Sequence, residues 1–142
     1  MTARKTYLVP IDFSKTAQKA LAHAVQLART NQAKLLLLHV ITESSTRVPF
    51  QLRDDYFDSI ETEARAHIKK LIKRYQLTPK MYRVVILRGN NAAQLIADQA
   101  KKSRVAMIIM GSQGLKGVSR LILGSVAEQT LRYASAPVLI VK

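Results

Sequence analysis

Short apolar runs alternate with longer segments of helical periodicity along most of the chain. The runs are largely apolar on both faces, which is typical of strands buried within a sheet that helices cover on each side. Strands are predicted at residues 7–11, 35–40, 82–87, 105–110 and 137–141.

Helices are predicted between these runs from apolar spacings of three and four residues. Ser14 is the expected N-cap of the first helix and Asn31 its end. The apolar face of this first helix is built largely from small residues: Ala17, Ala20, Leu21, Ala24, Val25 and Ala28. A loop at 43–52 precedes a long helix at 54–75, which is acidic at its start and basic at its end, as a helix dipole favours. A third helix is capped by Asn90 or Asn91, and the last begins at Ser125.

The alternation of strands and helices predicts one α/β domain over residues 1–142, with a doubly wound parallel sheet and helices on both faces. Ligands of such sheets bind outside the carboxyl ends of the strands, where the strand order reverses. The loops that follow the first and fourth strands, at Asp12 and at Gly111, are therefore the candidate ligand-binding loops.

Composition changes the expected class of partner more than the expected fold. The net charge is +14, but lysine and arginine are spread through the chain without a compact run that includes aromatic residues. We interpret the charge mainly as a solvated basic surface, with nucleic-acid binding as the alternative. There is no cysteine, no apolar run of the ~18 residues needed to span a membrane, and no signal peptide, so a cytoplasmic protein is expected.

The strongest chemical pattern is Gly111-x-x-Gly114, nine further residues, and then Gly124-Ser125. Glycine permits positive φ and the close approach of a ligand. Ser125 followed by Glu128 three residues later indicates a capping box at a helix start, where N–H groups and the helix dipole attract anions. The pattern predicts a phosphate site; the alternative is an ordinary strand-to-helix connection in which Ser125 is only a cap.

Other polar residues leave alternatives open. Asp12 is placed to accept hydrogen bonds from a ribose or a base, or to cap the next helix locally. Lys116 and Arg120 either approach phosphates or belong to a solvated loop. The three histidines do not have metal-ligand spacing and are interpreted as structural or exposed; no P-loop, G-x-G-x-x-G fingerprint or general base for hydrolysis is evident. The residues therefore favour binding over turnover.

Two segments carry a family resemblance. The segment Val9-Pro10-Ile11-Asp12-Phe13-Ser14 and the stretch from Ile109 through the glycine pattern to Val141 resemble the universal stress protein family, essentially from end to end. The glycine pattern resembles the branch of that family that binds ATP. The resemblance implies a five-stranded parallel sheet of order 3-2-1-4-5 and a homodimer formed through the last strand, at Val138, Leu139, Ile140 and Val141. Pairing would also cover an apolar edge strand that invites aggregation when bare.

The resemblance also implies a ligand, ATP, bound with a divalent ion such as Mg²⁺. Asp12 would contact the adenosine part, and the backbone of Val40 would contact the adenine. The full set of implied nucleotide contacts is Pro10, Ile11, Asp12, Val40, Met110, Gly111, Gln113, Gly114, Gly124, Ser125 and Val126. Ala106 and Gln113 replace a frequent acidic residue and a frequent histidine, but neither replacement removes a backbone donor.

The expected function is that of an ATP-binding regulatory homodimer in a stress response. One alternative is slow ATP hydrolysis or self-phosphorylation, with Ser112, Ser119 or Ser125 as acceptor. The other is a stress factor that binds polyanions or proteins without nucleotide, and its mark would be affinity that falls steeply with salt.

Overall fold

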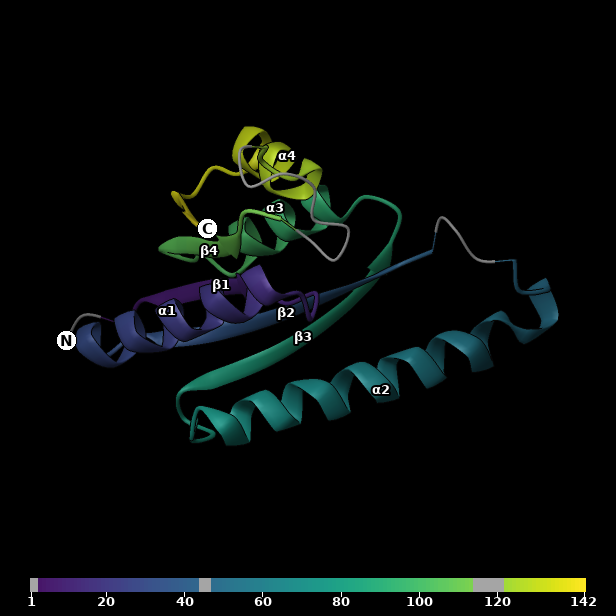
Figure 1. Cartoon of the computed structure of the whole chain (residues 1–142), viewed down its shortest axis with the longest axis horizontal. Coiled ribbons are helices and arrows are strands. Elements are labelled where there is room, and N and C mark those ends of the chain that lie inside the picture. The colour runs from purple at the N-terminus through teal and green to yellow at the C-terminus, as the bar shows by residue number, and fades with distance from the viewer. Residues whose placement is uncertain (1–2, 44–46, 114–121) are drawn as a thin grey trace.

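A computed structural model shows strands and helices alternating along the whole chain (Figure 1). The structure describes residues 3–43, 47–113 and 122–142. The strands are β1 (Thr6–Pro10), β2 (Lys34–Thr42), β3 (Tyr82–Gly89), β4 (Met107–Gly111) and β5 (Val138–Val141). The helices are α1 (Lys15–Asn31), α2 (Arg53–Arg74), α3 (Ala92–Lys102) and α4 (Ser125–Tyr133), with a short 3₁₀ turn η1 (Phe50–Leu52) before α2.

The five strands form one parallel sheet of order β3-β2-β1-β4-β5, which confirms the predicted fold class. The strand order reverses at β1, whose neighbours are β2 and β4. β2 is longer than β1: the last paired residue of β1, Pro10, lies opposite Leu38, while β2 continues to Thr42. The end of β2 therefore projects beyond β1 and leaves one side of its backbone open.

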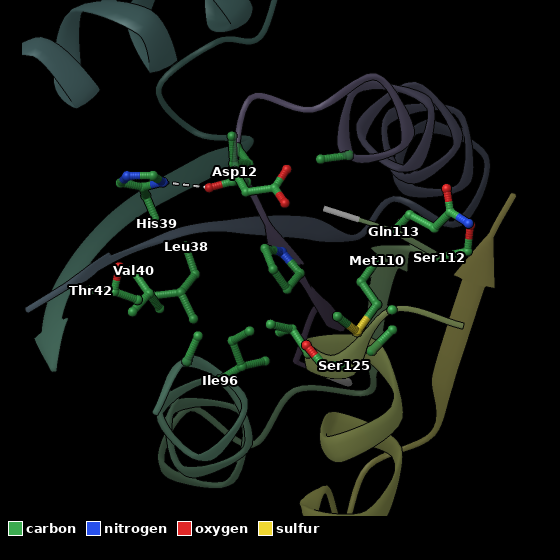
Figure 2. A pocket seen from close by; sticks show the side chains of 18 of the residues that line it. Asp12, Leu38, His39, Val40, Thr42, Ile96, Met110, Ser112, Gln113 and Ser125 are labelled. Carbon is green, nitrogen blue, oxygen red and sulfur yellow. Dashed lines mark hydrogen bonds between the residues drawn. The ribbon is translucent and has the colours of Figure 1, made fainter. Parts of the chain in front are cut away.

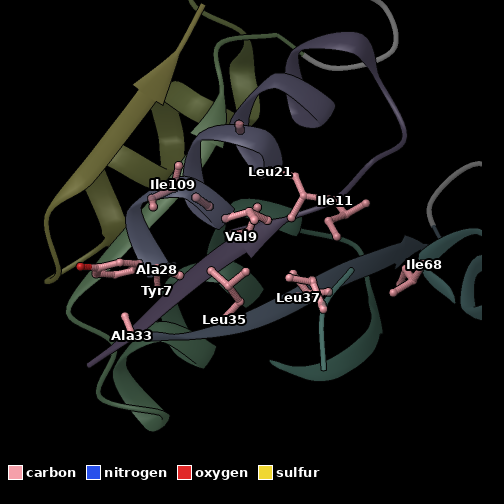
Figure 3. Packing of buried hydrophobic residues seen from close by; sticks show 14 residues of the cluster. Tyr7, Val9, Ile11, Leu21, Ala28, Ala33, Leu35, Leu37, Ile68 and Ile109 are labelled. Carbon is pink, nitrogen blue, oxygen red and sulfur yellow. The ribbon is translucent and has the colours of Figure 1, made fainter. Parts of the chain in front are cut away.

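Two apolar layers hold the sheet between the helices. One layer packs α1 and α2 against alternate side chains of the strands, including Val9, Leu37 and Ile109 (Figure 3). The opposite side chains, including Leu36 and Ile108, pack with residues of α3 and α4. Each fully buried side chain of this size contributes about 1.5–3 kcal/mol to folding, so both faces are needed. The predicted small face of α1 is confirmed, because all six of its expected residues are buried.

The helix ends follow the sequence signals closely. Ser14 caps α1 by accepting a hydrogen bond from the N–H of Ala17, and Asn91 caps α3 by accepting one from the N–H of Gln94. The chain leaves α1 through Gln32, which has the left-handed conformation. The loop predicted at 43–52 contains η1, while residues 44–46 lie outside the described part.

Two predicted details of local structure were wrong, the start of one strand and the cap of one helix. The fourth strand begins at Met107 instead of Val105, because the chain pairs with β1 only from Tyr7 opposite Met107 onward. The N-cap of α4 is Gly124, with no side-chain hydrogen bond, so the predicted capping box does not form. Glu128 instead forms an ion pair with Arg132 across one helical turn, 2.8 Å apart. No helix among the described residues is both long and apolar enough to cross a membrane.

Candidate nucleotide site

A cavity of about 1090 Å³ lies at the carboxyl ends of β1, β2 and β4, where the strand order reverses. Its volume is at the upper end of the ~300–1,000 Å³ typical of small-molecule sites. In Figure 2 the side chains of Asp12, Val40, Ile96 and Ser125 surround a common space. The cavity lining includes these predicted contact residues: Pro10, Ile11, Asp12, Val40, Met110, Gly111, Gln113, Gly124, Ser125 and Val126. Gly114, Lys116, Ser119 and Arg120 lie outside the described residues.

Asp12 occupies the turn between β1 and α1. Its Oδ1 accepts a hydrogen bond from the N–H of Ser14 at 3.0 Å and another from the Ser14 hydroxyl. The Ser14 oxygen in turn accepts from the N–H of Ala17 at 3.2 Å, so Asp12 supports the helix cap. The predicted local role of Asp12 is present in the structure. Because Oδ1 makes both contacts, the second carboxylate oxygen is left for a ligand in the cavity.

Phe13 fixes the direction of this turn. Its φ is 65°, in the left-handed region that bulky residues rarely adopt. The Phe13 ring lies against the rings of His39 and His67, with both centroid distances 4.8 Å. His39 Nδ1 also pairs with the backbone oxygen of Ile11 at 2.5 Å (Figure 2). These contacts hold the strained turn, a role of Phe13 and His39 that was not predicted from the sequence.

The backbone of β2 presents hydrogen-bonding groups to the cavity. The N–H of Lys34 donates to Lys5, and the carbonyl of Leu38 accepts from Ile11, so even-numbered residues of β2 face β1. Odd-numbered residues face β3, as the bonds from Leu35 to Met81 and from Glu43 to Gly89 show. The N–H and C=O of Val40 therefore point to the side that β1 has already left. This edge offers one donor and one acceptor to a planar ligand.

Gly111 is needed for close packing and not for a turn in the backbone. No described glycine has positive φ, so that part of the glycine prediction was wrong for Gly111 and Gly124. A Cβ on Gly111 would lie 2.6 Å from Thr16 Oγ1 and 2.7 Å from the Thr16 carbonyl carbon. The missing side chain thus lets the start of α1 pass close to the end of β4. This contact brings the two candidate ligand-binding loops together.

The first turn of α4 forms the polar end of the cavity. The N–H of Gly124 donates to the carbonyl of Ser112 at 2.7 Å, so this glycine closes the base of the loop. The N–H groups of Ser125, Val126 and Ala127 have no acceptor within the helix, because they belong to its first turn. The Ser125 hydroxyl has no hydrogen-bond partner among the described residues. Together with the helix dipole, these donors suit an anion.

Gln113 links three parts of the site. Its side-chain Nε2 donates to the carbonyl of Ile122 at 3.1 Å, which joins the two described ends of the glycine loop. Its own carbonyl accepts a hydrogen bond from the Thr16 hydroxyl. Gln113 was predicted as a contact residue; its observed hydrogen bonds connect the two described ends of the glycine loop and join one of them to α1.

Apolar side chains form the rest of the wall. Leu38 and Met110 come from the sheet and are buried, and Ile96 comes from α3. Ile60 of α2 also lines the cavity. Leu38, Ile60 and Ile96 were not predicted as site residues, because their positions at the cavity depend on how the sheet and helices pack together. Asp12 and Glu128 are the carboxylates among the described lining residues.

No group of three or more metal-ligating side chains occurs among residues 3–43, 47–113 and 122–142. Mg²⁺ commonly keeps several waters and binds through substrate phosphates with only one or two carboxylates. In that arrangement the phosphates carry most of the coordination, so it needs no cluster of three protein ligands.

The fold and the cavity define an open, doubly wound α/β protein with a candidate ligand site at its topological switch point. The model of the universal stress protein family matches residues 3–142, and the chain therefore belongs to the universal stress protein family. The predicted family is confirmed.

Three known proteins show how far the similarity extends. Universal stress protein YxiE of Bacillus subtilis is 32% identical over 143 residues, which cover 95% of this chain and 97% of YxiE. The structure of MJ0577, from Methanocaldococcus jannaschii, superimposes with a TM-score of 0.88 at 29% identity and covers 99% of this chain and 97% of its own. A universal stress protein of Archaeoglobus fulgidus in complex with dAMP has a TM-score of 0.71 at 20% identity, with full coverage of both chains, and shows the shared fold.

Proposed function

We propose that this universal stress protein binds ATP in the cavity and acts as a nucleotide-dependent regulatory homodimer in a stress response. The proposal rests on one observation: two sets of backbone hydrogen-bonding groups face each other across the same cavity. The open edge of Val40 lies at one side, and the first turn of α4 lies at the other. A base and a phosphate chain need these two environments. By fold-level analogy, the dAMP complex of the Archaeoglobus fulgidus protein is consistent with an adenine nucleotide.

Adenine fits the Val40 edge better than guanine does. Adenine presents an acceptor, N1, beside a donor, the N6 amino group. The N–H of Val40 would donate to N1, and its C=O would accept from N6. Guanine reverses this pattern, because its N1 carries a proton and its O6 is an acceptor. Leu38, Ile96 and Met110 would supply the apolar contact with the base, and Asp12 would receive a ribose hydroxyl.

The phosphates would lie against the first turn of α4. Ser125, Val126 and Ala127 supply N–H groups there, and Ser125 adds a hydroxyl. Bound Mg²⁺ would reduce the repulsion between the phosphates and the carboxylates of Asp12 and Glu128. The proposed location is the cytoplasm, where ATP is available to such a site.

Calorimetric titration with Mg-ATP, beside Mg-GTP, tests the proposed ligand at ~0.15 M salt, where exposed charges are partly screened. We expect saturable binding of one ATP per subunit and at least about tenfold weaker binding of GTP, equivalent to ~1.4 kcal/mol. Equal binding of both nucleotides, or binding of neither, would contradict the proposed site.

The matched variants Ser125→Asp and Ser135→Asp test the phosphate end. An aspartate at the first position of α4 favours the helix but repels a phosphate chain. Ser125→Asp should therefore weaken ATP binding at least about tenfold without lowering the unfolding temperature. Ser135 is exposed and lies outside the cavity lining, so Ser135→Asp should bind as the parent does. Equal effects of the two variants would place the phosphates elsewhere.

The proposed dimer forms through the edge of β5. The carbonyls of Pro137 and Val141 accept hydrogen bonds from the β4 side, so Val138 and Ile140 direct their backbone groups outward. All four residues of β5 are only partly buried in the single chain. Antiparallel pairing with a second copy, related by a two-fold axis, would satisfy the outward groups and cover the apolar edge.

Light scattering on Ile140→Pro tests this interface, with Ile140→Val as the control. Proline removes an outward N–H and leaves the N–H groups that face β4 in place. We expect a dimer for the parent and for Ile140→Val, and a monomer for Ile140→Pro. A dimer that persists in Ile140→Pro would show that the subunits meet elsewhere.

A further inference from the structure

The two edges of the sheet carry opposite distributions of charge. All nine acidic residues belong to the described chain, and they lie in the turn after β1, at the end of β2, in the first half of α2, in α3 at Asp98 and at the start of α4. None lies in the segments that immediately precede strands β1 to β4. Lysine and arginine, in contrast, dominate those segments and the carboxyl ends of the first three helices.

Parallel strands bring these segments together at the amino edge of the sheet. Figure 1 shows the end of α2 and the start of β3 on the same side of the molecule. More than half of the 23 basic residues are exposed at this edge. We call the following residues the basic face: Arg4, Lys5, Arg29, Lys34, Lys69, Lys70, Lys73, Arg74, Lys80, Arg83, Lys101, Lys102 and Arg104. The charge that appears dispersed in the sequence is therefore concentrated in space.

Helix dipoles explain only part of the basic face. Cations in the last turn of a helix interact favourably with its carboxyl end, which accounts for Arg29, for Lys73 and Arg74, and for Lys101 and Lys102. No helix dipole requires the cations that precede the strands or begin them. Like charges gathered at one edge repel each other, so their presence at Lys5, Lys34 and Lys80 calls for another explanation.

Acidic partners do not neutralise the basic face. The ion pairs in the described part of the chain join Arg65 to Glu61, Arg88 to Glu43 and Arg132 to Glu128, and none of these residues belongs to the basic face. Two cations of the face make neutral hydrogen bonds instead. Arg83 donates to the hydroxyl of Ser103 and Arg29 to the backbone carbonyl of Tyr75. These residues are exposed and are available to an external anion.

We propose that the basic face binds the phosphate backbone of nucleic acid without sequence preference. An extended row of exposed cations at several positions matches a polyanion with repeated charges, which binds by releasing counterions. Membrane-bound surfaces usually add exposed apolar side chains that enter the lipid. In the described part of the chain, the exposed large apolar residues are in η1, in the first turn of α2, and beside or within α4, and none is in the segments of the basic face. Nucleic acid is therefore favoured over a lipid surface. The cavity at the opposite edge would stay open while the basic face is occupied.

The test compares two triple variants of equal charge. Lys5→Gln/Lys34→Gln/Lys80→Gln changes the basic face, whereas Lys15→Gln/Arg47→Gln/Arg53→Gln changes exposed cations near the carboxyl edge. Both variants have a net charge of +11, from 14 − 3. Fluorescence anisotropy would measure binding to labelled RNA and DNA oligonucleotides of mixed sequence, single- and double-stranded, over a series of salt concentrations. Circular dichroism would verify that both variants fold.

We expect the parent to bind every oligonucleotide with affinity that falls steeply with salt. Each lost phosphate contact lowers the log–log salt slope by ~0.7 on single strands, so the basic-face variant should lose about 2 from the slope and about tenfold in affinity at low salt. The control variant should lose much less.

Equal losses in the two variants would overturn the proposed face, because they would mean that only net charge matters. Absence of binding by the parent at low salt would overturn the proposal as well. So would binding to vesicles of anionic phospholipid that exceeds binding to the oligonucleotides at equal phosphate concentration. None of these outcomes depends on whether ATP binds in the cavity.

Discussion

The carboxyl edge of the sheet and the amino edge differ in how they present polar groups. At the carboxyl edge, a few backbone donors and acceptors face a cavity with apolar walls, and the side chains mainly hold the backbone in place. At the amino edge, many long cationic side chains extend into solvent from unrelated segments. The first arrangement suits one ligand of defined shape, because each group has one fixed direction. The second suits a ligand that is defined only by repeated charge. Substitutions at the two edges should therefore impair ligand binding in different ways.

The largest effect is expected at Gly111, because close packing there is needed for the stability of the carboxyl edge. In Gly111→Ala the new Cβ would meet the backbone of Thr16 at 2.7 Å, and backbone atoms cannot rotate away as a side chain can. We expect a loss of about 2–3 kcal/mol in the free energy of unfolding, at the upper end for overpacked sites. Urea denaturation would measure it.

Ser112→Ala is the control for Gly111→Ala. Its side chain lines the cavity but makes no hydrogen bond to a described residue, so we expect a change within ~0.5 kcal/mol. If both variants kept the parent's stability, the close approach of α1 to β4 would not be a requirement of the fold.

Val40→Pro tests whether the carboxyl edge works through its backbone. The substitution removes the N–H that faces the cavity, while the hydrogen bonds to β3 come from the odd-numbered residues and remain. We expect ATP to bind at least about tenfold more weakly, or ~1.4 kcal/mol, with a smaller loss in unfolding temperature than in Gly111→Ala. Val40→Ile keeps the N–H and should bind as the parent does. Unchanged ATP affinity in Val40→Pro would remove this strand from base recognition.

Two substitutions of Asp12 distinguish its role in the local turn from its proposed contact with the ligand. Asp12→Asn keeps an oxygen that can accept from Ser14, whereas Asp12→Ala leaves the turn without that acceptor. We expect Asp12→Ala to lose about 1 kcal/mol of stability, as for other capping residues, and Asp12→Asn to lose much less. In calorimetry, both should bind ATP several-fold more weakly if the carboxylate receives a ribose hydroxyl. Full affinity in Asp12→Asn would leave Asp12 with only its role in the turn.

Local signals predicted the fold class, and one topological rule together with the family resemblance predicted part of the cavity lining. Apolar periodicity identified every strand and long helix, and the rule for ligands of doubly wound sheets directed attention to Asp12 and Gly111. The tertiary contacts were not predictable in this way. Ile96 reaches the cavity only because α3 crosses the sheet, and the glycine at 111 serves the approach of α1 instead of a turn. The basic face was equally hidden, because its residues are distant in the sequence and meet only once the strands align.

The smallest effect is expected at Glu128, which lines the cavity and pairs with Arg132 at the surface. Glu128→Gln removes a negative charge close to the proposed phosphates, and since the pair is exposed its loss should cost little stability. We expect ATP to bind about two- to fivefold more tightly at low salt, with the gain shrinking as salt is raised. Glu61→Gln is the matched control: Glu61 pairs with Arg65 in the same i,i+4 geometry, but it does not line the cavity. An equal gain in both variants would mean that the affinity for ATP depends on the overall charge of the protein. That behaviour is expected of ligands of the amino edge and not of a shaped cavity.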